Sequence, residues 1–162
     1  SNVMLQIDIR GLDRKKYEEQ ALTLLKSVGL EGFEKTNPYE LSGGMKQRTS
    51  ICRALVHDPP LLLMDEPFGA LDALTREQIS MDIQNLWMET RKTVLLITHS
   101  IPEAVLLSDR VIVMSPRPGR IVEIIDIDLP RPRSLGRLPD HFNDYTDRIR
   151  RIFQNAGVLA FD

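Results

Sequence analysis

The chain is 162 residues long, with 42% hydrophobic and 27% charged residues and a formal net charge of -2 at pH 7. This length suits one domain with a sizeable core, and the near-neutral charge gives no reason to expect nucleic acid as a partner. No apolar run approaches the roughly 18 residues of a membrane span, and the single Cys52 favours a reducing compartment, so we expect a cytoplasmic protein that reaches a membrane only through a partner.

The first third of the chain is predicted to be helical. Apolar residues recur at helical spacing from Asp13 to Val28, and Asp13 is a suitable N-cap. After the turn-like pair Asn37-Pro38, a second helix is expected from Ser42 to about His57. The chain enters helical sequence with no preceding strand, and we therefore expect it to be a fragment of a larger domain.

The middle of the chain alternates strands with a helix. Leu61–Met64 is a short apolar run, typical of a strand that is buried on both faces. Thr75 with Gln78 forms the pattern of a capping box, which predicts the start of a helix. The β-branched and apolar run Thr93–Thr98 predicts a second buried strand.

A short helix and a hairpin are expected next. Ser100 with Glu103 is another capping-box pattern, for a helix that ends near residue 107. Val111–Met114 and Ile121–Ile127 are strand-like, and the Pro118-Gly119 pair between them suits a type II turn. We therefore expect an antiparallel hairpin.

Prolines break the following stretch into a linker, in which Arg131, Arg133 and Arg137 are predicted to be solvated. A last helix should begin near Asp140. The apolar side of this helix is formed by Phe142, Tyr145, Ile149, Ile152 and Phe153.

These elements predict an α/β fold, because strands alternate with helices as they do around a mainly parallel sheet. We expect a helical subdomain over residues 3–57, a partial α/β core with an incomplete sheet and flanking helices over 58–128, and a linker with a C-terminal helix over 129–162.

The strongest chemical signal is the run Leu41-Ser42-Gly43-Gly44-Met45-Lys46-Gln47-Arg48. Ser42 can cap a helix whose first amides and positive dipole favour an anion such as phosphate. Gly43 and Gly44 would let another molecule approach the backbone closely. Six specified residues arise by chance about once in ten million start positions, if each is ~7% abundant.

This run resembles the signature motif of the ABC ATPases, a family of P-loop NTPases. Leu61-Leu62-Leu63-Met64-Asp65-Glu66-Pro67 is similar to the family's Walker B strand, and two carboxylates at a strand's carboxyl end lie where α/β sheets bind ligands. The resemblance implies that Asp65 holds Mg²⁺, directly or through water, and that Glu66 is the catalytic base that activates the attacking water.

Two further segments resemble the family in the same order along the chain. Gly69-Ala70-Leu71-Asp72 resembles the D-loop, which implies that Ala70, Leu71 and Asp72 lie at a dimer interface. Thr98-His99-Ser100 follows the next strand, where the family has its switch histidine. The resemblance implies that His99 is catalytic, through contact with the γ-phosphate of ATP.

The family's architecture implies how these residues are shared between two subunits. Two copies sandwich two ATP molecules, so that Leu41, Ser42, Gly43, Gly44 and Gln47 would bind the nucleotide of the second copy in trans. Asp65, Glu66 and His99 would serve the chain's own ATP and Mg²⁺. Closure of the dimer drives a membrane permease, on the inner face of the cell membrane.

The sequence holds no Gly-x4-Gly-Lys phosphate loop (Walker A), because none of its nine glycines is followed by lysine. The aromatic residue that stacks on adenine and the glutamine-bearing loop of the family are absent as well. All three precede the signature in the family. We therefore expect the parent protein to be an ATPase and this stretch, by itself, to be inactive.

At a finer level, three features resemble the nitrate, sulfonate and taurine importers: Asn2-Val3, Arg10-Gly11 and the turn Met114–Arg120. This resemblance implies integral-membrane permease subunits as partners and, indirectly, an external solute-binding protein. The solute itself does not follow from the sequence. The alternatives are a non-transport ABC ATPase, as in DNA repair or translation, and a regulatory or interaction module without catalysis.

The sheet order of the related ATPases implies one more expectation. Their phosphate-loop strand lies between the strands that correspond to Val94–Ile97 and Val111–Met114. Without that strand both edges are open, and we expect them either to pair directly or to recruit a second copy.

Overall fold

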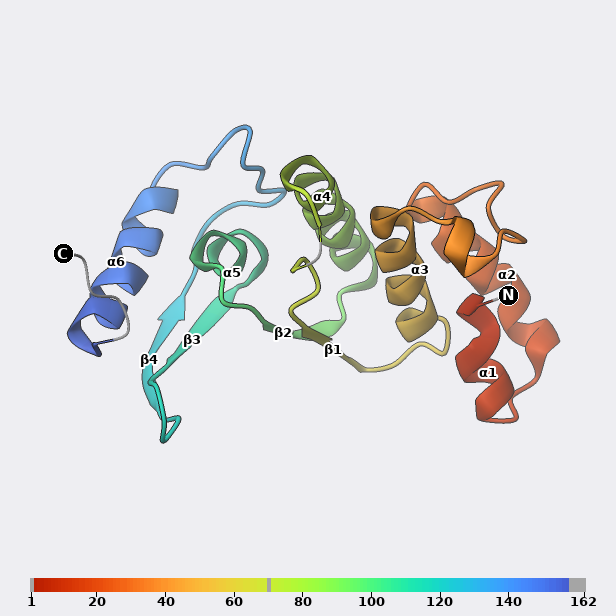
Figure 1. The fold of residues 1–162 in the computed structure, drawn as a ribbon, viewed down its shortest axis with the longest axis horizontal. Coiled ribbons are helices and arrows are strands. Elements are labelled where there is room, and N and C mark those ends of the chain that lie inside the picture. Colours follow the sequence, from red (N-terminus) through yellow and green to blue (C-terminus); the bar gives the residue numbers. More distant parts are fainter. Residues whose placement is uncertain (1, 70, 158–162) are drawn as a thin grey trace. The chain divides into compact units, whose positions relative to one another are not determined.

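A computed structural model describes residues 2–69 and 71–157, and these form two compact units, Ser1–Leu95 and Leu96–Asp162 (Figure 1). Each unit is described here by itself. The sequence predicted a different division, by motif, into residues 3–57, 58–128 and 129–162. This division stays a prediction.

The elements of the first unit lie in the order η1 (Asn2–Met4), α1 (Leu5–Ile9), α2 (Arg14–Ser27), η2 (Pro38–Glu40), α3 (Gly43–Leu55), β1 (Leu61–Asp65), α4 (Ala73–Thr90) and β2 (Thr93–Ile97). The boundary between the units falls within β2, whose last two residues belong to the second unit. The second unit continues with α5 (Ile101–Leu107), β3 (Arg110–Met114), β4 (Ile121–Asp126) and α6 (Phe142–Asn155).

The two helices predicted for the first third of the chain are confirmed. Asp13 caps α2 by accepting a hydrogen bond from the Lys15 amide at 3.0 Å, and Ser42 caps α3. Helices α1, α2 and α3 pack on one another (Figure 1), because each turns its apolar stripe toward the same core. Ile7 and Cys52 lie at the centre of this core and have no exposed surface.

Strands β1 and β2 form a two-stranded sheet and are joined by α4, the kind of helical connection that parallel neighbours require. The prediction that β1 is buried on both faces is wrong. Leu62 and Met64 are buried, whereas Leu61 and Leu63 remain 47% and 66% exposed. The buried pair faces α3 and α4, whereas the side chains on the opposite face stay largely open to solvent.

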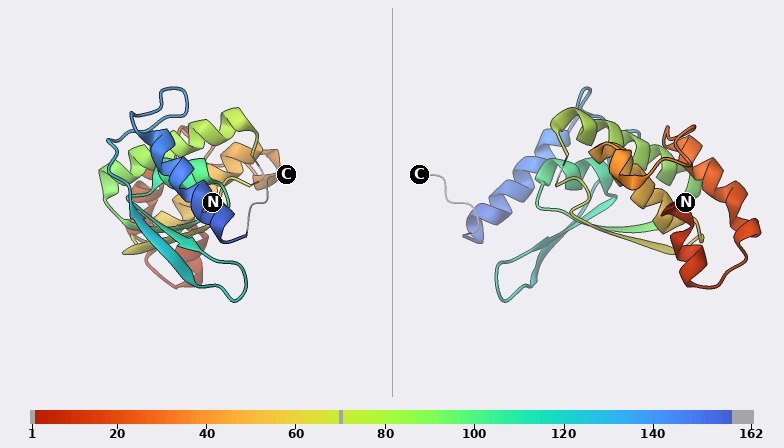
Figure 2. Two further views of the ribbon diagram at one scale, coloured as in Figure 1. Left: turned by 90° about the vertical axis from the view of Figure 1, so that its left-hand side faces the viewer. Right: turned by 45° about the vertical axis from the view of Figure 1, so that its right-hand side comes forward.

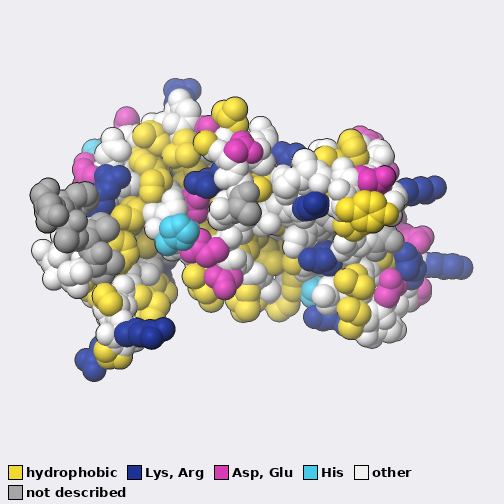
Figure 3. Space-filling model, in the orientation of Figure 1, with side chains coloured by type: hydrophobic (Ala, Val, Ile, Leu, Met, Phe, Trp, Pro, Cys, Tyr) yellow, Lys and Arg dark blue, Asp and Glu magenta, His cyan; other side chains and the backbone are white. Residues whose placement is uncertain are grey.

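Strand β2 is also less buried than its sequence predicts. Leu95 is 49% exposed and Ile97 54%, so the odd-numbered positions of this strand face solvent. A continuous apolar run indicates a strand that is covered by other elements on both faces. In the described part of the chain, such elements cover one face only. Figure 3 shows the resulting hydrophobic surface over β1 and β2.

The start of α4 differs from the prediction. Asp72, and not Thr75, is the N-cap, and the helix begins at Ala73. The Asp72 carboxylate accepts both the Thr75 amide, at 3.0 Å, and the Thr75 hydroxyl, at 2.6 Å. The side chain of Gln78 does not return to the cap, because it donates to Asp82 Oδ1 at 3.1 Å.

The hairpin of the second unit is confirmed. Strand β3 pairs antiparallel with β4, and the β-bulge lies between Val113 and Met114. The turn extends beyond α5 (Figure 2), but it is not type II, because Gly119 lacks the positive φ that this turn requires. One face of the hairpin packs on α5 and α6, together with Leu129.

The C-terminal helix is confirmed as well, and it buries Phe142 and Ile149 against the hairpin. Two polar contacts fix α6 to β4 and the residues that follow it. The Tyr145 hydroxyl accepts from the Asp128 amide at 3.1 Å, and the Arg148 guanidinium pairs with Glu123.

Arg133 contradicts its predicted solvation, because only 1% of it is exposed. Its guanidinium donates to the carbonyl oxygens of Val105 and Ser108, at 2.8 and 2.7 Å, and to that of Leu129 at 2.7 Å. Burial and the nearby Arg131 lower the pKa of Arg133 to about 10. The residue thus connects the end of α5 with the segment after β4, whereas Arg137 is exposed as predicted.

Candidate functional site

The signature run begins helix α3. Ser42 has an extended backbone, and its hydroxyl accepts from the Met45 amide at 3.3 Å. The first amide that donates within the helix is that of Lys46, to the Ser42 carbonyl oxygen at 2.9 Å, so helix geometry gives the Gly43 and Gly44 amides no partner within α3. Ser42 and Gly43 are exposed, which leaves this helix end accessible to an anion.

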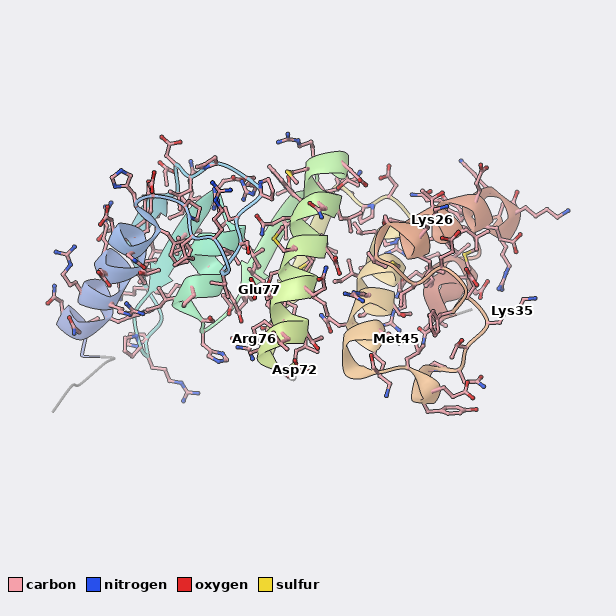
Figure 4. All side chains as sticks on the ribbon, turned by 90° about the horizontal axis from the view of Figure 1, so that it is seen from above. Lys26, Lys35, Met45, Asp72, Arg76 and Glu77 are labelled. Carbon is pink, nitrogen blue, oxygen red and sulfur yellow. The ribbon has the colours of Figure 1, made fainter. Side chains whose placement is uncertain are left out.

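Gly44 has a structural role that the sequence did not reveal. It is buried, and a Cβ atom at this position would lie 2.7 Å from Thr75 Cγ2. A Cβ on Gly43 would meet only Leu71 Cδ2, at 3.8 Å. Figure 4 shows the reason: α3 and α4 lie side by side, with Met45 and Asp72 near their corresponding ends. Gly44 therefore serves the contact between two helices of the same chain.

A half-buried ion pair fixes the same two helices further along. Arg48 Nε lies 2.8 Å from Asp82 Oδ2, and both side chains are at most 20% exposed. Of the other signature residues, Leu41 is buried in the core and Gln47 is half-buried. Their contribution to nucleotide binding stays a prediction.

Asp65 is the last residue of β1 and Glu66 follows it, and both are exposed. Glu66 has a φ of 46°, a left-handed conformation that costs a residue other than glycine roughly 1–2 kcal/mol. Phe68 is 1% exposed and anchors the turn, while the Gly69 amide donates to the Glu66 carbonyl oxygen at 3.3 Å. Strain of this kind clusters at functional sites, in agreement with the predicted role of Glu66.

The donor set around Asp65 suits Mg²⁺ only when other ligands are added. No group of three or more His, Cys, Asp or Glu side chains gathers among residues 2–69 and 71–157. Mg²⁺ in nucleotide sites is held by one or two carboxylates together with phosphate oxygens and water. The two adjacent carboxylates fit this mode, in which nucleotide phosphates complete the shell.

The predicted D-loop leads into α4. Asp72 is its N-cap, and hydrogen bonds from the Thr75 side chain and amide lower the pKa of this carboxyl. Leu71 is half-buried, and its carbonyl oxygen accepts from Arg76 at 3.1 Å. Ala70 lies outside the described residues, so its interface role, like that of the other two, stays a prediction.

His99 belongs to the second unit and is exposed after the end of β2. The backbone on either side of it is fixed by hydrogen bonds. The Thr98 hydroxyl donates to Glu103 Oε2 at 2.7 Å and accepts from the Ser100 amide at 3.1 Å. Glu103 is 7% exposed, and this contact replaces the capping box that the sequence predicted with Ser100.

Sequence reasoning missed the supporting carboxylate of Asp82, and it assigned Glu103 to a cap with Ser100 and not to its contact with Thr98. Glu103 lies five residues after Thr98, in the first turn of α5. Asp82 gives no local signal, because its partner Arg48 lies in another helix.

None of the helices in the described part of the chain is long and apolar enough to cross a membrane.

Comparison with known proteins shows what the chain is similar to. Residues 2–69 match the sequence profile described as "ABC transporter". An ABC transporter ATP-binding protein of Methanocaldococcus jannaschii is 47% identical over 159 residues, which are 98% of this chain and 59% of that protein. The taurine import ATP-binding protein of Rhizobium johnstonii is 47% identical over 165 residues, with 98% and 63% of the two chains covered.

A third relative is the aliphatic sulfonates import ATP-binding protein of Bacillus cereus, which is 40% identical over 92% of this chain and 59% of its own. Among solved structures, cbiO1 from Clostridium perfringens, part of the ABC transporter complex cbiONQ, has a TM-score of 0.68 at 27% identity. That match covers 76% of this chain and 49% of the other.

The chain spans about three fifths of the length of the curated relatives it matches. The roles of the signature run, the two carboxylates and His99 stay predictions. Residues 2–69 thus match the ABC transporter family, and over more than nine tenths of its length the chain is similar to ATP-binding proteins of ABC transporters.

Proposed function

We propose that this chain is part of the ATP-binding subunit of an ABC-type solute importer, in which ATP hydrolysis drives a membrane permease. The observation that carries the proposal is the 40–47% identity to taurine and aliphatic sulfonate import ATP-binding proteins over more than nine tenths of the chain. Those names favour an importer over an ATPase of DNA repair or translation, and taurine-like or sulfonate-like solutes over other classes.

Within this function, Glu66 accepts a proton from the attacking water and His99 contacts the γ-phosphate. Asp65 holds Mg²⁺, which neutralises phosphate charge when it is bound. The left-handed backbone at Glu66 and the Thr98–Glu103 contact support these roles, because each fixes a backbone beside a predicted catalytic residue.

We further propose that the start of α3 binds ATP on a second copy of the subunit, through Ser42, Gly43 and Gln47. The exposed helix end and its two amides support this role, with Leu71 and Asp72 nearby at the copy–copy interface. Permease subunits are the remaining direct partners, and an external solute-binding protein acts through them. The protein then works at the inner face of the membrane.

A hybrid protein tests the proposal. Residues 2–162 replace the aligned segment of the Rhizobium johnstonii taurine import ATP-binding protein, which supplies the part of the domain that this chain does not match. The hybrid should hydrolyse ATP, and Glu66→Gln should lower kcat by roughly 10²–10⁴ because it removes the base but keeps the side chain's size. Mg-ATP binding should survive.

Glu89→Gln is the matched control, because Glu89 is an exposed glutamate on α4 outside the site. It should leave kcat unchanged. If Glu66→Gln keeps ATP turnover within a few-fold of the hybrid, Glu66 is not the base.

A further inference from the structure

A cavity of about 320 Å³ lies in the first unit, between α1, α3 and the start of β1. Its polar lining consists of Gln6, Arg10, Ser50, Arg53 and His57. Figure 3 shows a histidine side chain flanked by Lys or Arg side chains at the surface over the connection from α3 to β1. Neither the catalytic carboxylates nor the signature run contributes to this cavity.

The charge of the cavity is positive. Among the described residues that line it, two are arginines and none is acidic. No hydrogen bond or ion pair joins the Arg10 side chain to any described residue. Arg53 donates only to uncharged groups, Asn2 Oδ1 at 2.7 Å and Ser50 Oγ at 3.2 Å. Two guanidinium groups thus share one cavity without a carboxylate partner in it.

His57 adds a polar group whose hydrogen-bonding capacity is not used. Its Nδ1 is buried and has no hydrogen-bond partner among the described residues. Burial and the positive charge of Arg10 lower the pKa of His57, and the nearby Asp58 opposes this effect. Asp58 itself pairs with Lys92 at 2.6 Å, which reduces its effect on the cavity. A bound anion would offset the positive charge of the two guanidinium groups and could accept a hydrogen bond from the His57 ring.

The rest of the lining is apolar. Leu61, Leu62 and Leu63 of β1 border the cavity together with Ala54 and Pro59. Binding sites for small organic molecules combine such an apolar surface with a few convergent polar groups. An inorganic ion would leave this surface unused.

We propose that the cavity binds a small organic oxyanion, whose head group contacts Arg10, Arg53 and His57 and whose short apolar tail lies on the leucines of β1. This inference does not depend on the proposed ATPase function. Arginine suits the head group, because its guanidinium donates two parallel hydrogen bonds to a carboxylate, sulfonate or phosphate.

Butanesulfonate is a suitable probe, measured by NMR on the full chain. We expect saturable shifts of the His57 ring with a dissociation constant on the order of 1 mM, as befits so small a ligand. Arg10→Gln should weaken binding about tenfold, the effect of one charge-assisted hydrogen bond, and Arg10→Lys should restore part of it. Arg120→Gln removes an exposed arginine of the hairpin turn and should change nothing.

The bound anion should also raise the pKa of His57 and leave the NMR signals of the His141 ring in place, which separates binding at the cavity from a general salt effect. Butanol and inorganic sulfate complete the design. Binding of butanol as tight as that of butanesulfonate would mean an apolar gap without an anion site. If sulfate binds as tightly as butanesulfonate and Arg10→Gln does not weaken its binding, the site holds an adventitious ion only. Each of these results, like the absence of saturable shifts, would overturn the proposal.

Discussion

The two glycines of the signature run have different surroundings although they are adjacent. Gly43 is exposed at the start of α3, whereas Gly44 is buried against α4. A motif that suggests one shared role in nucleotide binding thus combines an accessible backbone with a helix–helix contact.

Alanine substitutions separate the two roles. Gly44→Ala places Cβ 2.7 Å from Thr75 Cγ2, and we expect it to lower the free energy of unfolding by about 1–3 kcal/mol, as overpacking does. Gly43→Ala makes only an ordinary van der Waals contact, 3.8 Å from Leu71 Cδ2, and gains helix propensity, so the stability of this variant should be unchanged or slightly higher. Urea denaturation followed by circular dichroism measures both. Equal stability of the two variants would contradict the assignment.

Cys52 is predicted to be unreactive. Burial raises the pKa of its thiol to about 12, and Sγ lies 3.4 Å from the Leu24 carbonyl oxygen. The folded chain should react with a disulfide reagent at pH 8 far more slowly than the denatured chain, because the thiolate is the nucleophile. A thiol whose labelling rate is the same in both states would refute this.

The same shift makes stability depend on pH. The folded pKa lies above the unfolded value of 9.0, so the unfolded chain loses the proton first as pH rises. The stabilisation is complete below pH about 9 and is lost progressively toward pH about 12, by up to ~1.4 kcal/mol per pH unit. Cys52→Ala should remove this part of the alkaline destabilisation in urea titrations.

Among the elements, α5 depends on polar contacts at both ends. At its start, the Glu103 carboxylate accepts from Thr98, and at its end the Arg133 guanidinium donates to the carbonyl oxygens of Val105 and Ser108. Arginine suits the second position because its planar fork has five donors. Seven residues are too few for a stable helix in water, so these contacts and the hairpin determine where α5 lies.

Removal of the arginine tests this account. Arg133→Ala leaves buried carbonyl oxygens without donors, and we expect it to lower the free energy of unfolding of the second unit by about 3–5 kcal/mol. Arg137→Ala, at an exposed arginine four residues later, should stay within about 0.5 kcal/mol of the parent. Hydrogen exchange of the α5 amides would localise the loss, and equal effects of the two substitutions would contradict it.

At the scale of the whole molecule, the sheets are incomplete. Strand β2 is paired only with β1 and β3 only with β4 among the described residues, so the expected direct pairing of β2 with β3 is not formed. Recruitment of a second copy stays a prediction. The exposed apolar side chains of β1 and β2 support it, since exposed apolar surface and open strand edges favour association.

Light scattering coupled to gel filtration tests this association. Leu63→Asn removes a leucine that is 66% exposed on the sheet, and it should weaken self-association about tenfold, the effect of one buried leucine. Leu74→Asn removes an 81% exposed leucine on α4 and serves as the control. A chain that stays monomeric at all concentrations would contradict the prediction.

Nucleotide binding by the 162 residues alone is expected to be weak. The sequence has no Gly-Lys phosphate loop, and that loop's backbone and lysine bind the β- and γ-phosphates in P-loop proteins. Titration calorimetry with Mg-ATP should give a dissociation constant of about 1 mM or weaker, whereas the hybrid with the taurine import protein should bind more tightly. Micromolar binding by the chain alone would be incompatible with this account.

The sequence by itself determined the order of helices and strands, the resemblance to a family and the identity of the candidate residues. These features depend on local patterns, such as helical spacing, the Asp13 and Ser42 caps and the carboxylates that follow an apolar run. Such patterns can be recognised in the sequence because each depends only on residues that lie close together along the chain.

Only the tertiary structure decided which faces are covered and which polar groups are paired. The burial of Arg133, the contact of Gly44 with Thr75 and the exposure of Leu63 all depend on how segments that are distant in the sequence pack together. An apolar run indicates that a strand tends to be buried, but it does not say which of its faces is covered. The Arg133 guanidinium can donate to four carbonyl oxygens only because folding brings them close together.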